Sequence, residues 1–291
     1  MKLSEALLVG MCSALIAAAL LRAANFAGTT ELKLASQPAF DRVIKTHTLR
    51  CAYSSMKPYF VTVDADRNMV NGLSHDIVEQ MGRILGLKIE WVQEVAATAV
   101  AADLAAGDED AMCFPLWPDG RNAATLDFTH ALDYMPVYAV VRADDTRFDG
   151  NLSKLNVKDI IIPIIPDGEG KTIADEDFPL AQQYNITVEA DPLHMILAVT
   201  TKKGDVAFSD PFTAGEFMRN NPGMLKYATG VAPVRVFPES FAVAKGETKL
   251  RDMMNVAIDQ MQESGFIRAT LDKYLGDHKG EYFYWSRGWE P

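Results

Sequence analysis

An arginine and an aspartate, each just beyond a stretch that reads as a β-strand, are the residues of this sequence best suited to hold a small charged molecule. Arg121 lies a few residues past the apolar run Ala111–Leu116, and Asp210 directly follows the run Val206–Ser209. A guanidinium can donate two parallel hydrogen bonds to a carboxylate, and a carboxylate accepts hydrogen bonds from an ammonium. Open α/β sheets bind ligands at the carboxyl ends of their strands. The two residues therefore predict a site for a zwitterion; the alternatives are a surface arginine and a turn aspartate before Pro211.

Two aromatic residues lie close to strand ends and are candidates for packing against a ligand. Tyr59 follows Pro58 after the first predicted strand, and Trp117 follows the third. Aromatic rings at strand ends also belong to hydrophobic cores, so ligand contact and core packing both stay open for each residue.

Several sharper motifs fail at the positions that their chemistry needs. The Gly-Lys-Thr at 170–172 resembles the end of a phosphate-binding loop, but Ile165 stands where the first glycine is required. The acidic turn at 64–68 resembles the start of a calcium loop, yet its sixth position is Met69 and its twelfth is His75. The five histidines show no metal-ligand spacing. We therefore expect no nucleotide, metal or cofactor.

The composition is typical of a globular protein with an acidic surface. Hydrophobic residues make up 48% and charged residues 23%, which excludes disordered, collagenous and multi-spanning membrane proteins. The formal net charge of -11 argues against binding to a nucleic-acid backbone, which normally needs a basic face.

The N-terminal region predicts export. The apolar run Ala6–Leu21 has the length of a signal-peptide core and is shorter than a usual membrane-spanning helix. We expect residues 1–24 to be either a cleaved signal peptide or an uncleaved membrane anchor, and residues 25–45 to be a spacer. We expect the folded part to lie in the periplasm and to be a monomer. Its contact with the membrane is then only through the N-terminal segment.

Two of the three cysteines fall on predicted strands. Cys51 lies on the first strand and Cys113 on the third, and these strands are candidates for neighbours in one sheet. An oxidising compartment permits a disulfide between them, but three cysteines are too few for a disulfide scaffold, and we expect buried free thiols.

Strand and helix patterns alternate along the folded part. Strands are predicted over 49–53, 88–92, 111–116, 160–165, 186–188 and 206–209. Helices are predicted over 77–85, 98–106, 192–200, 249–263 and 266–275, with a further helix running into 179–184. Two more extended segments, 138–142 and 234–243, cross between the halves. This order predicts two α/β units joined by two crossings.

Several short motifs, in order over about residues 46–276, resemble the family 3 extracellular solute-binding proteins, the periplasmic amino-acid receptors of ABC transporters. They are Leu49-Arg50, Pro58-Tyr59, Gly72 with Asp76, LAAGDEDA at 104–111, Arg121, Asp127-Phe128-Thr129, KGDVAFSD at 203–210 and the stretch 265–276. The resemblance implies a type II periplasmic-binding-protein-like α/β fold, with a ligand cleft between lobes joined by two hinge strands. The first lobe would comprise 46–140 plus 237–291, and the second 141–236.

The resemblance also implies roles for individual residues. Arg121 matches the arginine that holds the α-carboxylate, Asp210 the acid that holds the α-amine, and Tyr59 the aromatic that packs on the ligand side chain. Asp76, Trp117 and Glu169 complete the expected ligand-binding set.

This sequence departs from the family pattern in two places. Before the arginine, residues 113–120 carry Cys, Phe, Pro, Leu and Trp instead of the usual Ser and Thr, which predicts a more apolar pocket or a ligand that is not a standard amino acid. In the second lobe, the loop 167–170 carries Asp167 and Glu169 where the family usually has a Gly-Thr pair. These acids disfavour an anionic ligand group and favour a cationic one.

The favoured function is a binding protein whose lobes close on an amino acid or related solute and dock on an ABC permease. A second hypothesis is an enzyme on the same scaffold, as some family relatives are dehydratases of cyclic carboxylic acids; Glu169 or His75 would then be the acid or base. A third is a membrane-anchored sensory or accessory domain.

Overall fold

A computed structural model describes most of the 291-residue chain after residue 37. The described residues are 38–55, 59, 61–64, 69–96, 99–120, 122–166, 168–187 and 192–275. The predictions for residues 1–37, for Arg121 and Asp167, and for the chain beyond 275 lie outside this part.

The first lobe contains a parallel core of three strands. The strand β1 (Thr48–Tyr53) lies between β4 (Lys88–Glu94) and β5 (Ala111–Leu116) and runs parallel to both. Two helices connect them, α3 (Leu73–Leu85) and α4 (Val100–Ala106), with a short hairpin of β2 (Val61–Asp64) and β3 (Met69–Asn71) before α3. Gly72 begins α3 with φ of 138°, a backbone conformation that glycine adopts most easily. The strand-helix alternation read from the sequence is confirmed here.

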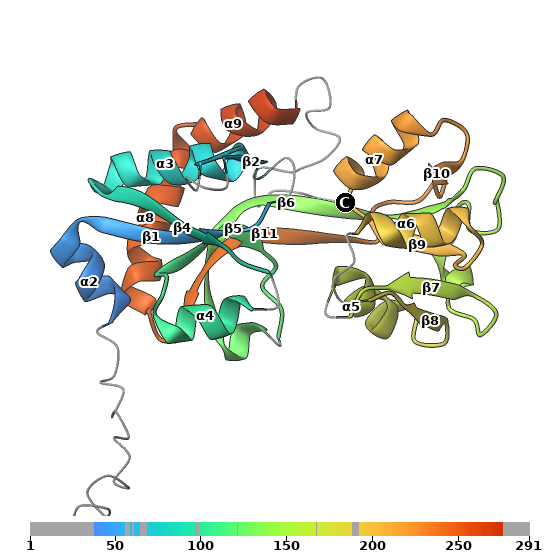
Figure 1. Ribbon diagram of the computed structural model, residues 1–291. Coiled ribbons are helices and arrows are strands. Elements are labelled where there is room, and N and C mark those ends of the chain that lie inside the picture. Colours follow the sequence, from blue (N-terminus) through green and yellow to red (C-terminus); the bar gives the residue numbers. More distant parts are fainter. Residues whose placement is uncertain are drawn as a thin grey trace, which may run out of the picture.

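Two long strands, which we call the crossing strands, run from the first lobe into the second (Figure 1). They are β6 (Leu126–Arg142) and β11 (Arg235–Ala244), which pair antiparallel with each other. Up to Val137, β6 pairs with β11; from Tyr138 onward it pairs with strands of the second lobe. The crossing strands thus connect both halves without interruption.

The second lobe is built around the far half of β6. The strands β9 (Val206–Ser209) and β10 (Leu225–Tyr227) pair antiparallel with it, and β7 (Ile161–Ile164) pairs parallel with β8 (Gln182–Asn185). The helices are α5 (Glu169–Asp177), α6 (Leu193–Thr200) and α7 (Pro211–Asn220). In the view of Figure 1, α7 lies above the crossing strands and α5 below them.

The chain returns to the first lobe along β11 and ends its described part in two helices. These are α8 (Thr248–Glu263) and α9 (Phe266–Leu275), which lie beside α3 (Figure 1). On α8, Asn255 Oδ1 accepts a hydrogen bond from the His130 backbone N–H at 2.7 Å, and Gln262 donates to the Ala131 carbonyl at 2.6 Å. The helix is thereby fastened to the first half of β6.

The sequence predicts a spacer over 25–45, but its last part is a helix, α2 (Ala39–Thr46). Val43 is fully buried, and Arg42 donates to the buried Asp110 at 2.9 Å. Carboxylate oxygens of Glu247 accept hydrogen bonds from the first backbone N–H groups, beginning with Ala39 at 2.9 Å. The helix is too short to show a long apolar period, so the sequence pattern does not predict it. Contacts with other elements stabilise it.

The expectation of free thiols is wrong, because Cys51 and Cys113 form a disulfide. Their strands, β1 and β5, are direct parallel neighbours, and Cys51 lies opposite Ala111, two residues before Cys113. The two Cα atoms are 5.5 Å apart, which is in the range that a disulfide spans, and both residues are fully buried.

Three other elements differ from their predicted positions. The predicted crossing 138–142 is only the end of β6, which begins at Leu126. The helix predicted to run into 179–184 ends at Asp177, and 182–185 form β8 instead of the predicted strand 186–188. The helix α7 was absent from the predicted elements. None of the helices in the described part of the chain is long and apolar enough to cross a membrane.

Candidate functional site

Two helices of the second lobe each begin with an acidic residue that follows a strand. Asp210 comes directly after β9 and caps α7, where its Oδ1 accepts a hydrogen bond from the Thr213 backbone N–H at 2.9 Å. Glu169 is the first residue of α5, in the segment that follows β7. Carboxylates favour helix N-termini because the exposed N–H groups there attract negative charge.

Burial changes the protonation of both acids. It raises the pKa of Glu169 to about 8, a rise opposed by a backbone hydrogen bond and reinforced by the charge of Asp210. Burial also raises the pKa of Asp210, against the hydrogen bonds from the start of α7. Like charges that interact raise each other's pKa, and the charge of Asp210 contributes in this way to the raised pKa of Glu169.

The crossing strands contribute a second pair of acids. Asp133 on β6 and Glu239 on β11 are direct partners in the antiparallel pairing, so their side chains lie on the same face. Asp133 is fully buried and Glu239 is 3% exposed. We call these two residues the acid pair.

The acid pair is held in an unfavourable electrostatic environment. Burial raises the pKa of Asp133 to about 8. Burial, followed by the charge of Asp133, raises the pKa of Glu239 well above its ordinary value, and Glu169 and Asp210 add to the rise. The four carboxyl groups therefore form one interacting cluster at the meeting point of the crossing strands and the second lobe.

Aromatic residues of the first lobe and of β11 border this cluster. Trp117 Nε1 donates a hydrogen bond to Glu239 Oε1, and the Trp117 ring stacks on Phe237 with centroids 4.8 Å apart. Tyr59 packs edge-on against Phe114 at 5.6 Å and is 2% exposed. Burial and the charges of Glu239, Asp133 and Asp210 raise the pKa of the Tyr59 phenol, which places this ring beside the same acids.

The structure brings together four of the six residues that the sequence predicts for ligand binding. Asp210 and Glu169 belong to the cluster of carboxyl groups, and Trp117 and Tyr59 border it, whereas Arg121 lies outside the described residues.

Asp76 lies elsewhere and joins two helices. Its Oδ2 accepts hydrogen bonds from Lys273 at 2.6 Å and from the Tyr274 hydroxyl at 3.0 Å, both on α9. Burial raises its pKa, but the hydrogen bonds from Lys273, Tyr274 and His75 outweigh burial and leave it lowered. These contacts stabilise the packing of α3 on α9.

The acid pair was not among the site residues predicted from the sequence. Glu239 lies inside the predicted crossing 234–243, and a charged residue inside an extended apolar segment was the available signal. Asp133 lay outside every predicted strand, so its pairing partner was not visible.

The cluster has the chemistry of a cation site. Among the described residues, none of the four carboxyls has an ion-pair partner, and no group of three or more His, Cys, Asp or Glu side chains is arranged to hold a metal ion. An organic ammonium or guanidinium would be a charged partner for these carboxyls, which have none among the described residues.

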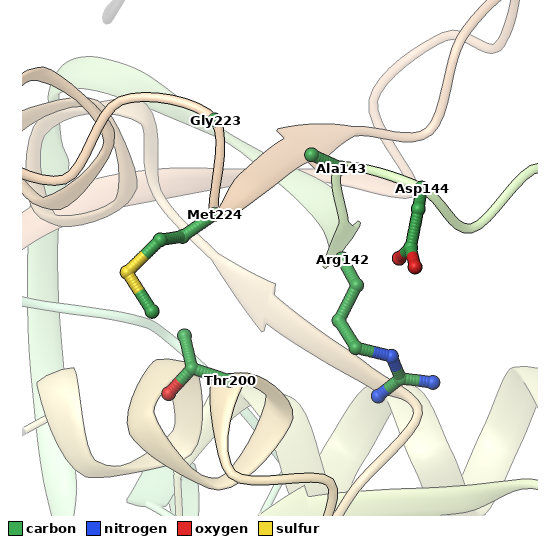
Figure 2. A pocket seen from close by; sticks show the side chains of 6 residues that line it. All are labelled: Arg142, Ala143, Asp144, Thr200, Gly223 and Met224. Atoms are coloured by element: carbon green, nitrogen blue, oxygen red, sulfur yellow. The ribbon is translucent and has the colours of Figure 1, made fainter.

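A separate hollow lies at the far end of the second lobe and differs in character. Figure 2 shows its lining, Arg142, Ala143, Asp144, Thr200, Gly223 and Met224. The Arg142 guanidinium donates to the carbonyls of Gly204 at 2.8 Å and Val199 at 3.2 Å. Because this arginine is engaged in holding α6 and β9 to β6, we do not place the functional site there.

Comparison with protein families gives a match over residues 49–277 to the bacterial extracellular solute-binding proteins, family 3. The chain belongs to this family. The resemblance read from the sequence motifs is thereby confirmed. No curated protein sequence matches the chain.

Solved structures with the same fold include several members of this kind. The ancestral amino acid-binding protein AncCDT-1, described as a precursor of cyclohexadienyl dehydratase, is 19% identical with a TM-score of 0.67, covering 82% of this chain and 99% of that one. A mutant of ArgBP from T. maritima is 17% identical with a TM-score of 0.63, covering 82% and 100%. The periplasmic VFT2 domain of BvgS from Bordetella pertussis is 15% identical with a TM-score of 0.67, covering 81% and 97%.

These similarities establish the fold of this family 3 chain as the two-lobed type II periplasmic-binding-protein fold. Family membership supports a solute-binding role outside the cytoplasm. The lobe boundaries after residues 140 and 236 stay a prediction.

Proposed function

We propose that this chain is the extracytoplasmic receptor of an ABC transporter and binds an amino acid or a related small polar solute between its lobes. The observation that carries the proposal is the convergence of Asp210 and Glu169 from the second lobe with Trp117 from the first. A crystal structure described as the substrate binding protein of an amino acid ABC transporter shares the fold, with 18% identity and a TM-score of 0.60. The receptor acts as a periplasmic monomer that docks on a membrane permease.

Each predicted contact has a distinct chemical part in this proposal. Asp210 accepts hydrogen bonds from the α-ammonium of the ligand, and Arg121 pairs with its carboxylate. Glu169 favours a cationic group, while Trp117 and Tyr59 pack against apolar parts of the ligand. Asp76 acts only through the packing of α3 on α9, since its carboxylate is engaged there.

The test is a thermal-shift screen of amino acids, amines and organic acids on the purified chain, followed by calorimetry with Asp210 variants. A ligand that binds only the native state raises the melting temperature. Asp210→Asn keeps a good helix cap but removes the charge, so we expect the affinity of the best hit to fall by about tenfold or more with little loss of stability. Asp210→Ala should lose the same affinity and also about 1 kcal/mol of stability.

The control is Glu263→Gln on the exposed end of α8, which should bind like the unmodified chain. Unchanged affinity in Asp210→Asn would refute the assigned role of this residue, and no hit from the screen would refute the amino-acid class of ligand.

One observation favours an enzyme as the second candidate. Glu169, with a pKa of about 8, is protonated at neutral pH and has the protonation state that a general acid needs. One structural relative, AncCDT-1, is described as a precursor of a dehydratase. Incubation with cyclic hydroxy acids, followed by chromatography for a dehydrated product, tests this; product formation that Glu169→Gln abolishes would replace the binding-protein proposal. His75, the other candidate acid, stacks on Trp91 and lies outside the cluster.

A further inference from the structure

We propose that the acid pair, Asp133 and Glu239, is a cation subsite that takes an ammonium or guanidinium group of the ligand in addition to any group held by Asp210. The inference rests on the proposed function, since it assumes that a small solute binds between the lobes. It narrows the ligand class to solutes with an organic cation on the side chain, such as basic amino acids and short diamines.

The geometry of the crossing strands supports this role. Directly opposed residues of an antiparallel pair have Cβ atoms about 5 Å apart, and like charges in that position are destabilising. The two acids are nevertheless the direct partners here, and both are buried. Neither carboxyl oxygen of Asp133 has a hydrogen-bond partner within the described part of the chain. Burying a polar group without a hydrogen-bond partner costs free energy, so a ligand that supplies the partner would remove this cost.

Among the described residues, the groups near the acid pair do not supply this partner. The charges of Glu169 from α5 and Asp210 from α7 act on Glu239, the charges of both members of the pair act on the Tyr59 phenol, and Trp117 donates one hydrogen bond to Glu239. Within the described residues, no Lys, Arg or His forms an ion pair with either member. Without ligand the pair keeps a proton at neutral pH, which the raised pKa of about 8 for Asp133 supports.

The neighbouring aromatic rings suit an organic cation better than a metal ion. Phe237 precedes Glu239 by two residues on β11, and therefore lies on the same face of the strand. Its ring and the stacked Trp117 ring are half-buried beside the pair. Aromatic faces attract ammonium and guanidinium groups. Among the described residues, no group of three or more His, Cys, Asp or Glu side chains, these acids included, is arranged to hold a metal ion.

The position on the crossing strands also gives the ligand a way in. In this fold the lobes move about the strands that connect them. A ligand that enters with the lobes apart can place its cation against β6 and β11 before the second lobe covers it.

Calorimetry with matched ligand pairs tests the subsite. Arginine and citrulline, and lysine and norleucine, have similar shapes but differ in side-chain charge. We expect the unmodified chain to prefer each cation by about tenfold or more, because a hydrogen bond to a charged partner contributes that much. In Asp133→Asn the preference should fall several-fold while affinity for the neutral ligand stays unchanged.

Three results would overturn the subsite while leaving the proposed function standing. The first is equal affinity for charged and neutral members of each pair in the unmodified chain. The second is a preference for the charged ligand that is as large in both Asp133→Asn and Glu239→Gln as in the unmodified chain. The third is a melting-temperature rise with calcium chloride but not with amines. Absence of binding by every ligand would instead count against the proposed function and the subsite together.

A matched variant separates a binding role from a structural one. Asp127→Asn makes the same chemical change on the same strand, but Asp127 pairs with Lys245 at 2.9 Å. Without ligand, Asp133→Asn should melt above the unmodified chain at pH 8, since it buries no charge, whereas Asp127→Asn should melt at or below it. A lower melting temperature for Asp133→Asn would mean that the carboxyl stabilises the fold, and would overturn the inference.

Discussion

At the scale of single residues, the binding region is defined by carboxyl groups whose surroundings oppose their ionisation. Burial raises the pKa of Glu169 and of Asp133 to about 8, and raises those of Asp210 and Glu239 as well. An acid with a cationic partner behaves in the opposite way: the hydrogen bond from the Lys245 ammonium holds the pKa of Asp127 below its usual range. The direction of the pKa shift therefore distinguishes carboxyl groups without a cationic partner among the described residues from those that have one.

These pKa values predict how stability depends on pH. Between about pH 4 and pH 8 the native state keeps a proton on Asp133 that the unfolded chain has lost, so the free energy of unfolding should fall as the pH rises through this window. Asp133→Asn has no such proton, and its stability curve should be flatter by that amount. Urea unfolding of both proteins at pH 5, 6.5 and 8 measures the difference.

The same groups predict the pH dependence of binding. A cationic ligand pairs with ionised carboxylates, so its affinity should increase from pH 6 to pH 9 as Glu169 and Asp133 lose their protons. If the stability curves of the unmodified chain and Asp133→Asn ran parallel and the ligand affinity did not change with pH, the acids would be ionised over the whole pH range. That result would contradict the raised pKa values of the cluster.

At the scale of elements, the first lobe is held together by covalent and polar links between strands and helices. The disulfide joins β1 to β5 in the middle of the parallel sheet, and Asp110 holds Arg42 of α2 and Arg50 of β1. Each link joins residues that are far apart in the sequence. It therefore fixes the relative positions of elements whose arrangement the local sequence does not determine. An intact buried disulfide also agrees with folding in an oxidising compartment.

The disulfide should contribute measurably to stability. It closes a loop between residues separated by 62 positions, for which loop-closure entropy predicts about 4 kcal/mol. We expect the Cys51→Ala/Cys113→Ala double variant to lose an amount of that order in urea unfolding and to keep its ligand affinity, because the bond lies in the core of the first lobe.

Mass measurement of alkylated protein with and without reductant provides the direct check on the disulfide. Alkylation of both cysteines in unreduced, unfolded protein would show that the bond is absent.

At the scale of the whole molecule, the crossing strands connect the two lobes and also carry the proposed cation subsite. Because β6 and β11 continue through both halves, a change in their backbone angles moves one lobe relative to the other as a unit. The acid pair lies on this connection. We propose that a cation bound there lets both carboxyls ionise and favours the closed arrangement.

Closure predicts a smaller molecule with ligand bound. Small-angle scattering should show the radius of gyration decrease when a cationic ligand saturates the chain, and show no decrease with Asp210→Asn at the same ligand concentration. The two proteins are compared at equal protein concentration. The ligand shifts the population toward the closed form only to the extent that it is bound. A radius unchanged by saturating ligand would refute hinge closure.

The sequence alone determined the features that depend on local pattern and on motif order. Strand 111–116, strand 206–209 and helix 266–275 match β5, β9 and α9, because apolar runs bounded by turn residues and an apolar helical period are local signals. The ordered motifs identified the family, and Asp210, Glu169 and Trp117 were named as site residues from the same reading.

Only the tertiary structure decided which distant residues meet. The disulfide depends on β1 and β5 being neighbours, α2 depends on partners such as Asp110 and Glu247, and the acid pair depends on the register that sets Asp133 opposite Glu239. Register between strands that lie about a hundred positions apart is set by packing of the whole fold, and no local pattern encodes it. In our proposal, the arginine and aspartate that first suggested a zwitterion site describe half of its chemistry, and the acid pair on the crossing strands supplies the other half.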